Sequence, residues 1–188
     1  MKHILRVVVI MICCSCSLTT WLSGDFTYHE NNHSHQLNTS GIYMHHYYTS
    51  PQESVYHGHY YYFIIPYQNG VMYGFSSLRE KDTNCSSISK IVATREKDTA
   101  SLRNTKYNWG AYKTEGDSIK IQSILLDGVP AAFGPYGRVV EHHGIILSDT
   151  SFVLTQYFNG KEKIEGNQLY ILHKCNARPD SSYFPFYD

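Results

Sequence analysis

Hairpin signals recur along this chain at short intervals, and they limit its possible folds more than any other feature. The turn-forming sequences Asn69-Gly70, Glu115-Gly116-Asp117 and Asn159-Gly160 each separate two segments rich in β-favouring residues. Glycine and asparagine tolerate the positive φ angles of tight hairpin turns, so Asn69-Gly70 predicts a type I′ turn. Strands joined by such turns lie side by side and antiparallel, as an up-and-down meander.

The segments between the turns supply eight candidate strands. They cover residues 41–49, 55–67, 71–78, 107–114, 118–124, 138–147, 151–158 and 168–175. Closing antiparallel strands into a barrel removes the exposed edges of the sheet. We therefore predict a mostly β protein, an eight-stranded antiparallel meander closed as a barrel. Its interior is filled by side chains or holds one small ligand.

Residues 79–105 break this pattern and predict one helical insertion after the third strand. Apolar residues recur there at spacings of three and four, which is typical of an amphipathic helix. These residues are Cys85, Ile88, Ile91 and Val92. Thr83 and Asn84 are both suitable N-terminal caps. The run from Ile91 to Thr94 also fits a short strand, so this segment has two interpretations.

The N-terminus has the pattern of an export signal. A basic start precedes an apolar run from Val7 to Cys14, which is too short to span a bilayer. The sequence Cys13-Cys14-Ser15-Cys16 resembles the lipobox of bacterial lipoproteins, in which a small residue precedes the cysteine that is lipidated and becomes the new N-terminus. This resemblance implies acylation of Cys16, with Cys14 or an ordinary cleaved signal as alternatives. It places the protein in the bacterial cell envelope, anchored to a membrane on the periplasmic or outer-membrane side.

The chain then divides into four parts: a signal peptide (1–15), a flexible tether (16–40), the barrel domain (41–176) and an irregular tail (177–188). The tether is rich in Ser, Thr, Asn and His, and a flexible coil of that length reaches roughly 25–30 Å. Cys85 and Cys175 lie in the barrel domain. Export permits a disulfide between them, and the alternative is two buried free thiols.

A second resemblance covers roughly residues 105–180. The pattern Trp-Gly-x-Tyr-x-x-x-Gly-Asp-x-Ile-x-Ile from Trp109 to Ile121, followed by Gly-x-x-Leu-x-Asp-Thr from Gly144, resembles a group of small uncharacterised lipoproteins of Bacteroidota type. Those proteins are similar in build to lipocalin-like barrels. The resemblance implies a lipocalin-like fold and brings no catalytic residue with it.

Histidines in the first hairpin are the best candidates for a metal site. If Thr49 pairs with Val55, then His45 lies opposite His59, and His57 lies on the same face. Three imidazoles on one face form a ligand set that zinc or copper accepts. A register shifted by one residue replaces His45 by His46 and keeps the cluster. The alternative is that these histidines are ordinary strand residues among tyrosines.

Tyrosine is unusually frequent, with 17 residues, of which nine lie between Tyr43 and Tyr73. Tyrosine combines an apolar ring with a polar tip, which suits both a ligand cavity and a partner surface. The first interpretation is a barrel that holds a small apolar or aromatic molecule, with Tyr61, Phe63, Trp109 and Tyr112 as candidate contacts. The second is an envelope interaction or structural module that uses the Tyr-rich face.

Charge and motifs argue against other classes of function. The chain has 16 basic and 16 acidic residues, so it lacks the basic surface that nucleic-acid binding requires. It contains no nucleophile elbow, no phosphate-binding glycine loop and no dinucleotide fingerprint. We therefore expect a binding or structural protein rather than an enzyme.

Overall fold

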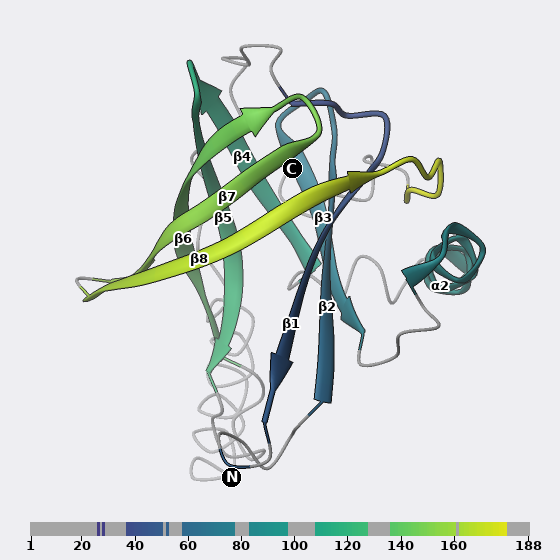
Figure 1. Cartoon of the computed structure of the whole chain (residues 1–188), viewed down its shortest axis with the longest axis horizontal. Helices are drawn as coiled ribbons and strands as arrows, with labels where there is room; N and C mark the ends of the chain where they lie inside the picture. The colour runs from purple at the N-terminus through teal and green to yellow at the C-terminus, as the bar shows by residue number, and fades with distance from the viewer. Residues whose placement is uncertain are drawn as a thin grey trace, which may run out of the picture.

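The chain folds as a closed, eight-stranded antiparallel barrel with one helix after the third strand, which confirms the predicted fold. The computed structural model describes residues 26, 28, 37–50, 52, 58–77, 83–97, 108–127, 136–160 and 162–179. The elements are β1 (Ile42–Thr49), β2 (Gly58–Pro66), β3 (Val71–Ser77), α2 (Cys85–Lys97), β4 (Trp109–Glu115), β5 (Ser118–Asp127), β6 (Tyr136–Ser148), β7 (Ser151–Asn159) and β8 (Glu162–His173). Each strand pairs with the next, and β8 returns to β1 (Figure 1).

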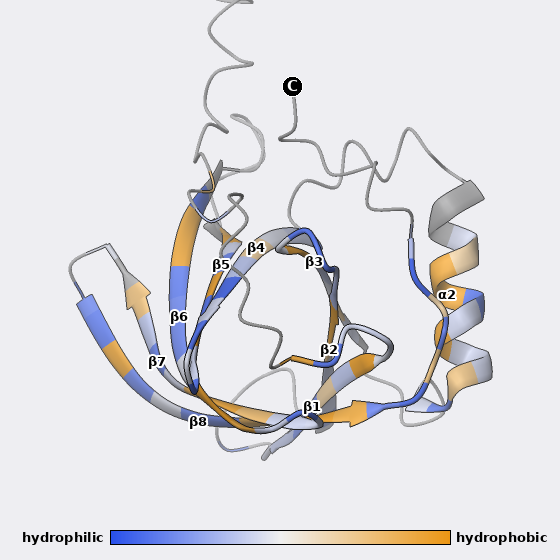
Figure 2. Ribbon diagram, turned by 90° about the horizontal axis from the view of Figure 1, so that it is seen from above, coloured by the Kyte–Doolittle hydropathy of each residue, from blue (hydrophilic) through white to orange (hydrophobic). Residues whose placement is uncertain are grey.

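Side chains of the strands are buried on both faces of the sheet. One face lines the barrel interior, and part of the outer face is covered by the helix. Inside the barrel, one core includes Tyr43 and Phe152. Outside the barrel, a second core joins Phe63 and Trp109 to Ile88 of α2. Figure 2 shows α2 beside β2 and β3, outside the ring of strands. None of the helices in the described part of the chain has the length and apolar character needed to span a membrane.

Helix α2 begins where the sequence predicts a cap and is tied to the C-terminal end of the barrel. The side-chain oxygen of Asn84 accepts a hydrogen bond from the backbone N–H of Ser87 at 2.9 Å, as an N-terminal cap does. A disulfide joins Cys85, the first residue of α2, to Cys175, which follows β8. The structure thus shows the disulfide that the sequence left open.

The turn at Asn69-Gly70 forms a hairpin, but its type differs from the prediction. Among the described residues, only glycines have positive φ, and Gly70 is one of them, at 79°. The backbone N–H of Tyr67 donates to the carbonyl of Val71 at 2.9 Å, so the loop contains three residues rather than two. A three-residue loop places the left-handed residue last, and glycine occupies that position.

The predicted register between the first two strands is wrong. Thr49 pairs with Gly58 rather than with Val55, so His45 lies opposite Tyr62. The reason is that β2 is buried on both faces. Phe63 belongs to the core beneath α2, and only the shifted register places Tyr43 opposite Ile64, which faces the barrel interior.

Two predicted boundaries also need correction. Strand β8 begins at Glu162 rather than at residue 168, because its polar first half extends beyond the core as an exposed hairpin arm. A free tether over all of residues 16–40 does not agree with the structure. Phe26 is fully buried in the core under α2, and Leu37 is buried in the barrel core. Apolar side chains of this segment complete the packing of the domain.

Strands β3 and β4 share a short seam beside the helical insertion. In the described part of the chain three residue pairs join them, from Val71↔Ala111 to Tyr73↔Trp109. Among the described pairings, residues 74–77 of β3 and 124–127 of β5 have no partner on β4. This part of the wall lies beside the cavity described next.

Candidate functional site: the barrel cavity

One half of the barrel interior is packed solid, and the other half contains a cavity. The packed half is formed by buried side chains that include Leu37, Tyr43, Ile119 and Phe152. The cavity has a volume of about 560 Å³. Small-molecule sites in proteins usually have volumes of about 300–1,000 Å³, so the cavity is large enough for one ligand.

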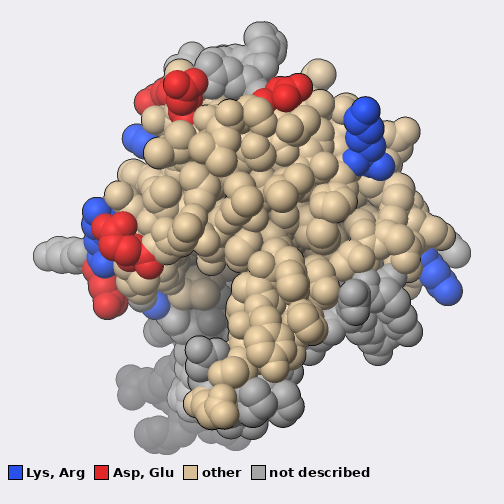
Figure 3. Space-filling model, in the orientation of Figure 1, with Lys and Arg blue, Asp and Glu red and all other residues tan. Residues whose placement is uncertain are grey.

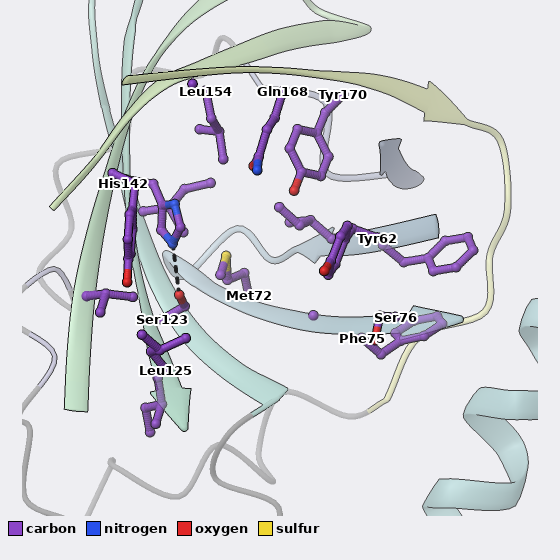
Figure 4. Close-up of a pocket in the computed structure, with 18 of the residues that line it drawn as sticks. Tyr62, Met72, Phe75, Ser76, Ser123, Leu125, His142, Leu154, Gln168 and Tyr170 are labelled. Atoms are coloured by element: carbon purple, nitrogen blue, oxygen red, sulfur yellow. Dashed lines mark hydrogen bonds between the residues drawn. The ribbon is translucent and has the colours of Figure 1, made fainter. Parts of the chain in front are cut away.

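The cavity wall is mainly apolar and is built by side chains that point inward from several strands (Figure 4). The apolar side chains include Met72, Leu125, Val140 and Leu154. The polar ones include Tyr62, Ser76, Ser123, His142, Gln168 and Tyr170. Such a wall, apolar with a few polar groups, is typical of sites that bind and orient small molecules.

Tyr170 holds the most constrained polar group of the cavity. Its side chain is 5% exposed. Its ring stacks on Phe152, with centroids 4.9 Å apart, and lies against His45 at 5.3 Å. Burial raises the pKa of the Tyr170 hydroxyl far above its ordinary value, so the group remains protonated and able to donate a hydrogen bond.

His142 lies across the cavity from Tyr170 and is held in the neutral form. The Nε2 atom lies 3.2 Å from the Ser123 hydroxyl, and the ring packs against Tyr157. Burial lowers the pKa of His142 to about 4; Glu141 partly opposes this shift, and His143 adds to it. At neutral pH the cavity therefore contains a neutral imidazole.

Acidification is expected to destabilise the fold through His142. The folded-state pKa of about 4 lies below the unfolded value of about 6.5. The unfolded chain therefore binds more protons as pH falls through this window, and stability is lost from about pH 6.5 down to about pH 4. The loss through this group is up to about 3 kcal/mol. Urea unfolding at about pH 7 and about pH 4 measures it, and His142→Gln should lose correspondingly less. Equal losses in the two proteins would contradict the assignment.

The four predicted ligand contacts lie in two different places. Tyr61, Phe63 and Trp109 belong to the core beneath α2, although Phe63 and Trp109 also border the cavity. Tyr112 points into the barrel, where its hydroxyl donates to the carbonyl of Tyr67 at 2.6 Å within the packed half.

The predicted histidine cluster is brought together only in part. His46 and His59 meet on the outer face of the first hairpin, with Nε2 and Nδ1 2.8 Å apart. His45 lies on the other face, where its Nδ1 is 2.9 Å from the carbonyl of Leu169. His57 lies outside the described residues. Over the part of the chain that the structure describes, no three His, Cys, Asp or Glu side chains form a group able to hold a metal ion.

Aliphatic side chains lie exposed on the outer wall of β6, β7 and β8. Ile145, Val153 and Leu169 are neighbours across these strands, and Leu147 and Ile171 extend the group, which we call the aliphatic face. Leu147 is 59% exposed and Ile171 is 50% exposed. Figure 3 shows Lys, Arg, Asp and Glu around the margin of the front face rather than across its middle. Tyr47 and Tyr48 are the exposed tyrosines of β1.

Neither Tyr170 nor His142 is among the site residues that the sequence predicts. One signal for His142 was present, because the two-residue hairpin loop between Ser148 and Ser151 could align β6 with β7. Bulges in β6 and β7 shift that alignment twice, so alternation alone does not show which side chains face inward.

The fold and the cavity together define a class: a closed eight-stranded β-barrel that could bind one small ligand. Comparison with known proteins adds no relative, since no protein-family model, curated protein or solved structure matches this chain.

Proposed function

We propose that this chain is a lipid-anchored protein of the bacterial cell envelope whose barrel binds one small apolar or aromatic molecule. The observation that carries the binding part is the cavity of about 560 Å³ with its largely apolar wall. A barrel that serves only as a rigid module would fill its interior with its own side chains. The export signal and lipobox resemblance support the location, and the Cys85–Cys175 disulfide agrees with an oxidising compartment.

Binding is tested with N-phenyl-1-naphthylamine, a neutral apolar dye whose fluorescence rises when it leaves water. We expect saturable binding of one dye per chain. Gly74 lines the cavity, and a Cβ placed there meets its nearest atom at 3.5 Å, an ordinary contact. A Gly74→Phe variant should therefore fill the cavity without a clash at Cβ and weaken dye binding by about tenfold or more.

The matched control for Gly74→Phe is Ser86→Phe, which adds the same ring on an exposed residue of α2. Its dye affinity should equal that of the wild type. Unsaturable fluorescence in the wild type, or wild-type affinity in a folded Gly74→Phe variant, would overturn the proposal of an internal site.

The anchor has a separate test in the mass of the denatured protein purified from membranes. A diacyl or triacyl mass on a chain that starts at Cys16 supports the anchor, and a bare chain contradicts it. The same sample under native conditions reports a bound molecule as additional mass that is lost on denaturation.

A second candidate function is favoured by the aliphatic face. Exposed apolar patches without charge are typical of surfaces that contact another protein, and this one adjoins Met44 on β1 through Ile171. We propose protein interaction in the envelope as the alternative. It becomes the preferred interpretation if the wild type shows neither saturable dye binding nor additional native mass.

A further inference from the structure

The cavity contains a rigid hydrogen-bond donor, the hydroxyl of Tyr170. Figure 4 shows the Tyr170 hydroxyl directed into the cavity. The described residues provide no hydrogen-bond partner for it, whereas the nearby Tyr112 hydroxyl donates to a backbone carbonyl. Because it faces the cavity, this hydroxyl can donate its hydrogen bond to an atom of a bound molecule. The ring cannot turn away easily, because Phe152 and His45 pack against it.

The charges around the cavity disfavour the binding of an ionic ligand. Of the described residues that line it, only Glu165 is charged at neutral pH. That carboxylate is exposed and paired with Lys163 at 2.7 Å, so it is already neutralised at the surface. An anionic ligand would therefore lose its hydration without meeting a cation among the described lining residues, which is costly in a buried site. The neutral His142 adds no positive charge.

Resting on the proposed binding function, we propose that the ligand is an uncharged, largely apolar molecule with a carbonyl oxygen that accepts a hydrogen bond from Tyr170. The apolar wall receives the body of the molecule, and the phenol fixes its orientation. A carbonyl oxygen accepts without donating, which matches a site whose fixed polar group is a donor.

The test uses a matched pair of rigid neutral probes, 9-fluorenone and fluorene, which differ in one carbonyl group. Both are titrated against the wild type and Tyr170→Phe by displacement of N-phenyl-1-naphthylamine. Tyr170→Phe removes only the hydroxyl and keeps the ring that stacks on Phe152. We expect it to weaken 9-fluorenone binding by about three- to tenfold and to leave fluorene binding within about twofold.

Two controls complete the design. Tyr48→Phe makes the same chemical change on the outer face and should alter neither affinity. Fluorene-9-carboxylate, an anion of similar shape, should bind the wild type at least about tenfold more weakly than 9-fluorenone.

The outcomes separate the two proposals. If both neutral probes bind and Tyr170→Phe weakens them equally or not at all, the carbonyl assignment is overturned and the internal site stands. If the anion binds as tightly as 9-fluorenone, the assignment of an uncharged ligand is overturned and the internal site stands. If neither probe displaces the dye and the dye itself does not saturate, the proposed function fails and this inference fails with it.

Discussion

Replacing Cys85 and Cys175 together by alanine is expected to lower the free energy of unfolding by about 4–5 kcal/mol, the value that loop-closure entropy gives for a long cross-linked segment. The bridge closes a segment with a sequence separation of 90 residues, which contains α2 and strands β4 to β8. Cutting it frees the unfolded chain and releases the helix from the end of the barrel. Guanidinium denaturation of the wild type and the double variant measures the difference.

Ser86→Ala is the matched control, because it changes the residue beside Cys85 at an exposed position of α2. Its stability should remain within about 0.5 kcal/mol of the wild type, as is usual for surface substitutions. Reduction of the wild type should reproduce the loss seen in the double variant. A loss below about 1 kcal/mol in both cases would show that the bridge contributes little to stability.

Replacing Trp109 by alanine is expected to lower the free energy of unfolding by about 3–5 kcal/mol, the usual cost of removing a large buried aromatic side chain. Trp109 is fully buried. Its ring meets Tyr73 edge-on with centroids 4.9 Å apart and lies near Tyr67 at 6.1 Å. The residue therefore holds β3 and β4 together where their seam is short.

This substitution also separates core packing from ligand contact. Under conditions in which Trp109→Ala is still folded, dye affinity should remain within about threefold of the wild type, because the indole packs mainly in the core beneath α2 and only borders the cavity. Tyr170→Phe should show the opposite pattern, with a small loss of stability and weaker binding of 9-fluorenone. A stable Trp109→Ala variant with strongly reduced dye affinity would place the indole in the ligand site instead.

The elements of this fold are visible in the sequence because they depend on local chemistry. Gly70, Gly116 and Gly160 all have positive φ, as tight hairpins require. Asn84 caps α2 where its side chain can reach the first turn of the helix. Eight strands joined by short connections leave few topologies other than the meander.

The faces of the strands are less predictable, because β2 and β3 are buried on both sides. An alternating strand normally reveals its core face by its apolar residues. In β2, however, Tyr61, Phe63 and Ile65 pack under the helix while Ile64 packs inside the barrel. The sequence pattern therefore predicts Tyr61 and Phe63 inside the barrel, as ligand contacts. No residue pattern within β2 indicates that α2, which follows β3 in the chain, covers its outer face.

The candidate site was hidden for a related reason. His142 and Tyr170 meet across the barrel through the pairings of β6, β7 and β8, and bulges interrupt those pairings. Each bulge reverses the inward and outward positions beyond it. The identity of the cavity residues thus depends on the register of the whole sheet rather than on any short motif.

The burial of Phe26 in the core beneath α2 changes how this protein would sit at a membrane. With a lipid on Cys16, only residues 17–25 separate the anchor from the folded domain, instead of the whole segment to residue 40. A flexible coil of that length reaches on the order of 17 Å. The folded domain would then lie within roughly that distance of the lipid headgroups. An apolar ligand would then have only a short distance to cover between the bilayer and the barrel.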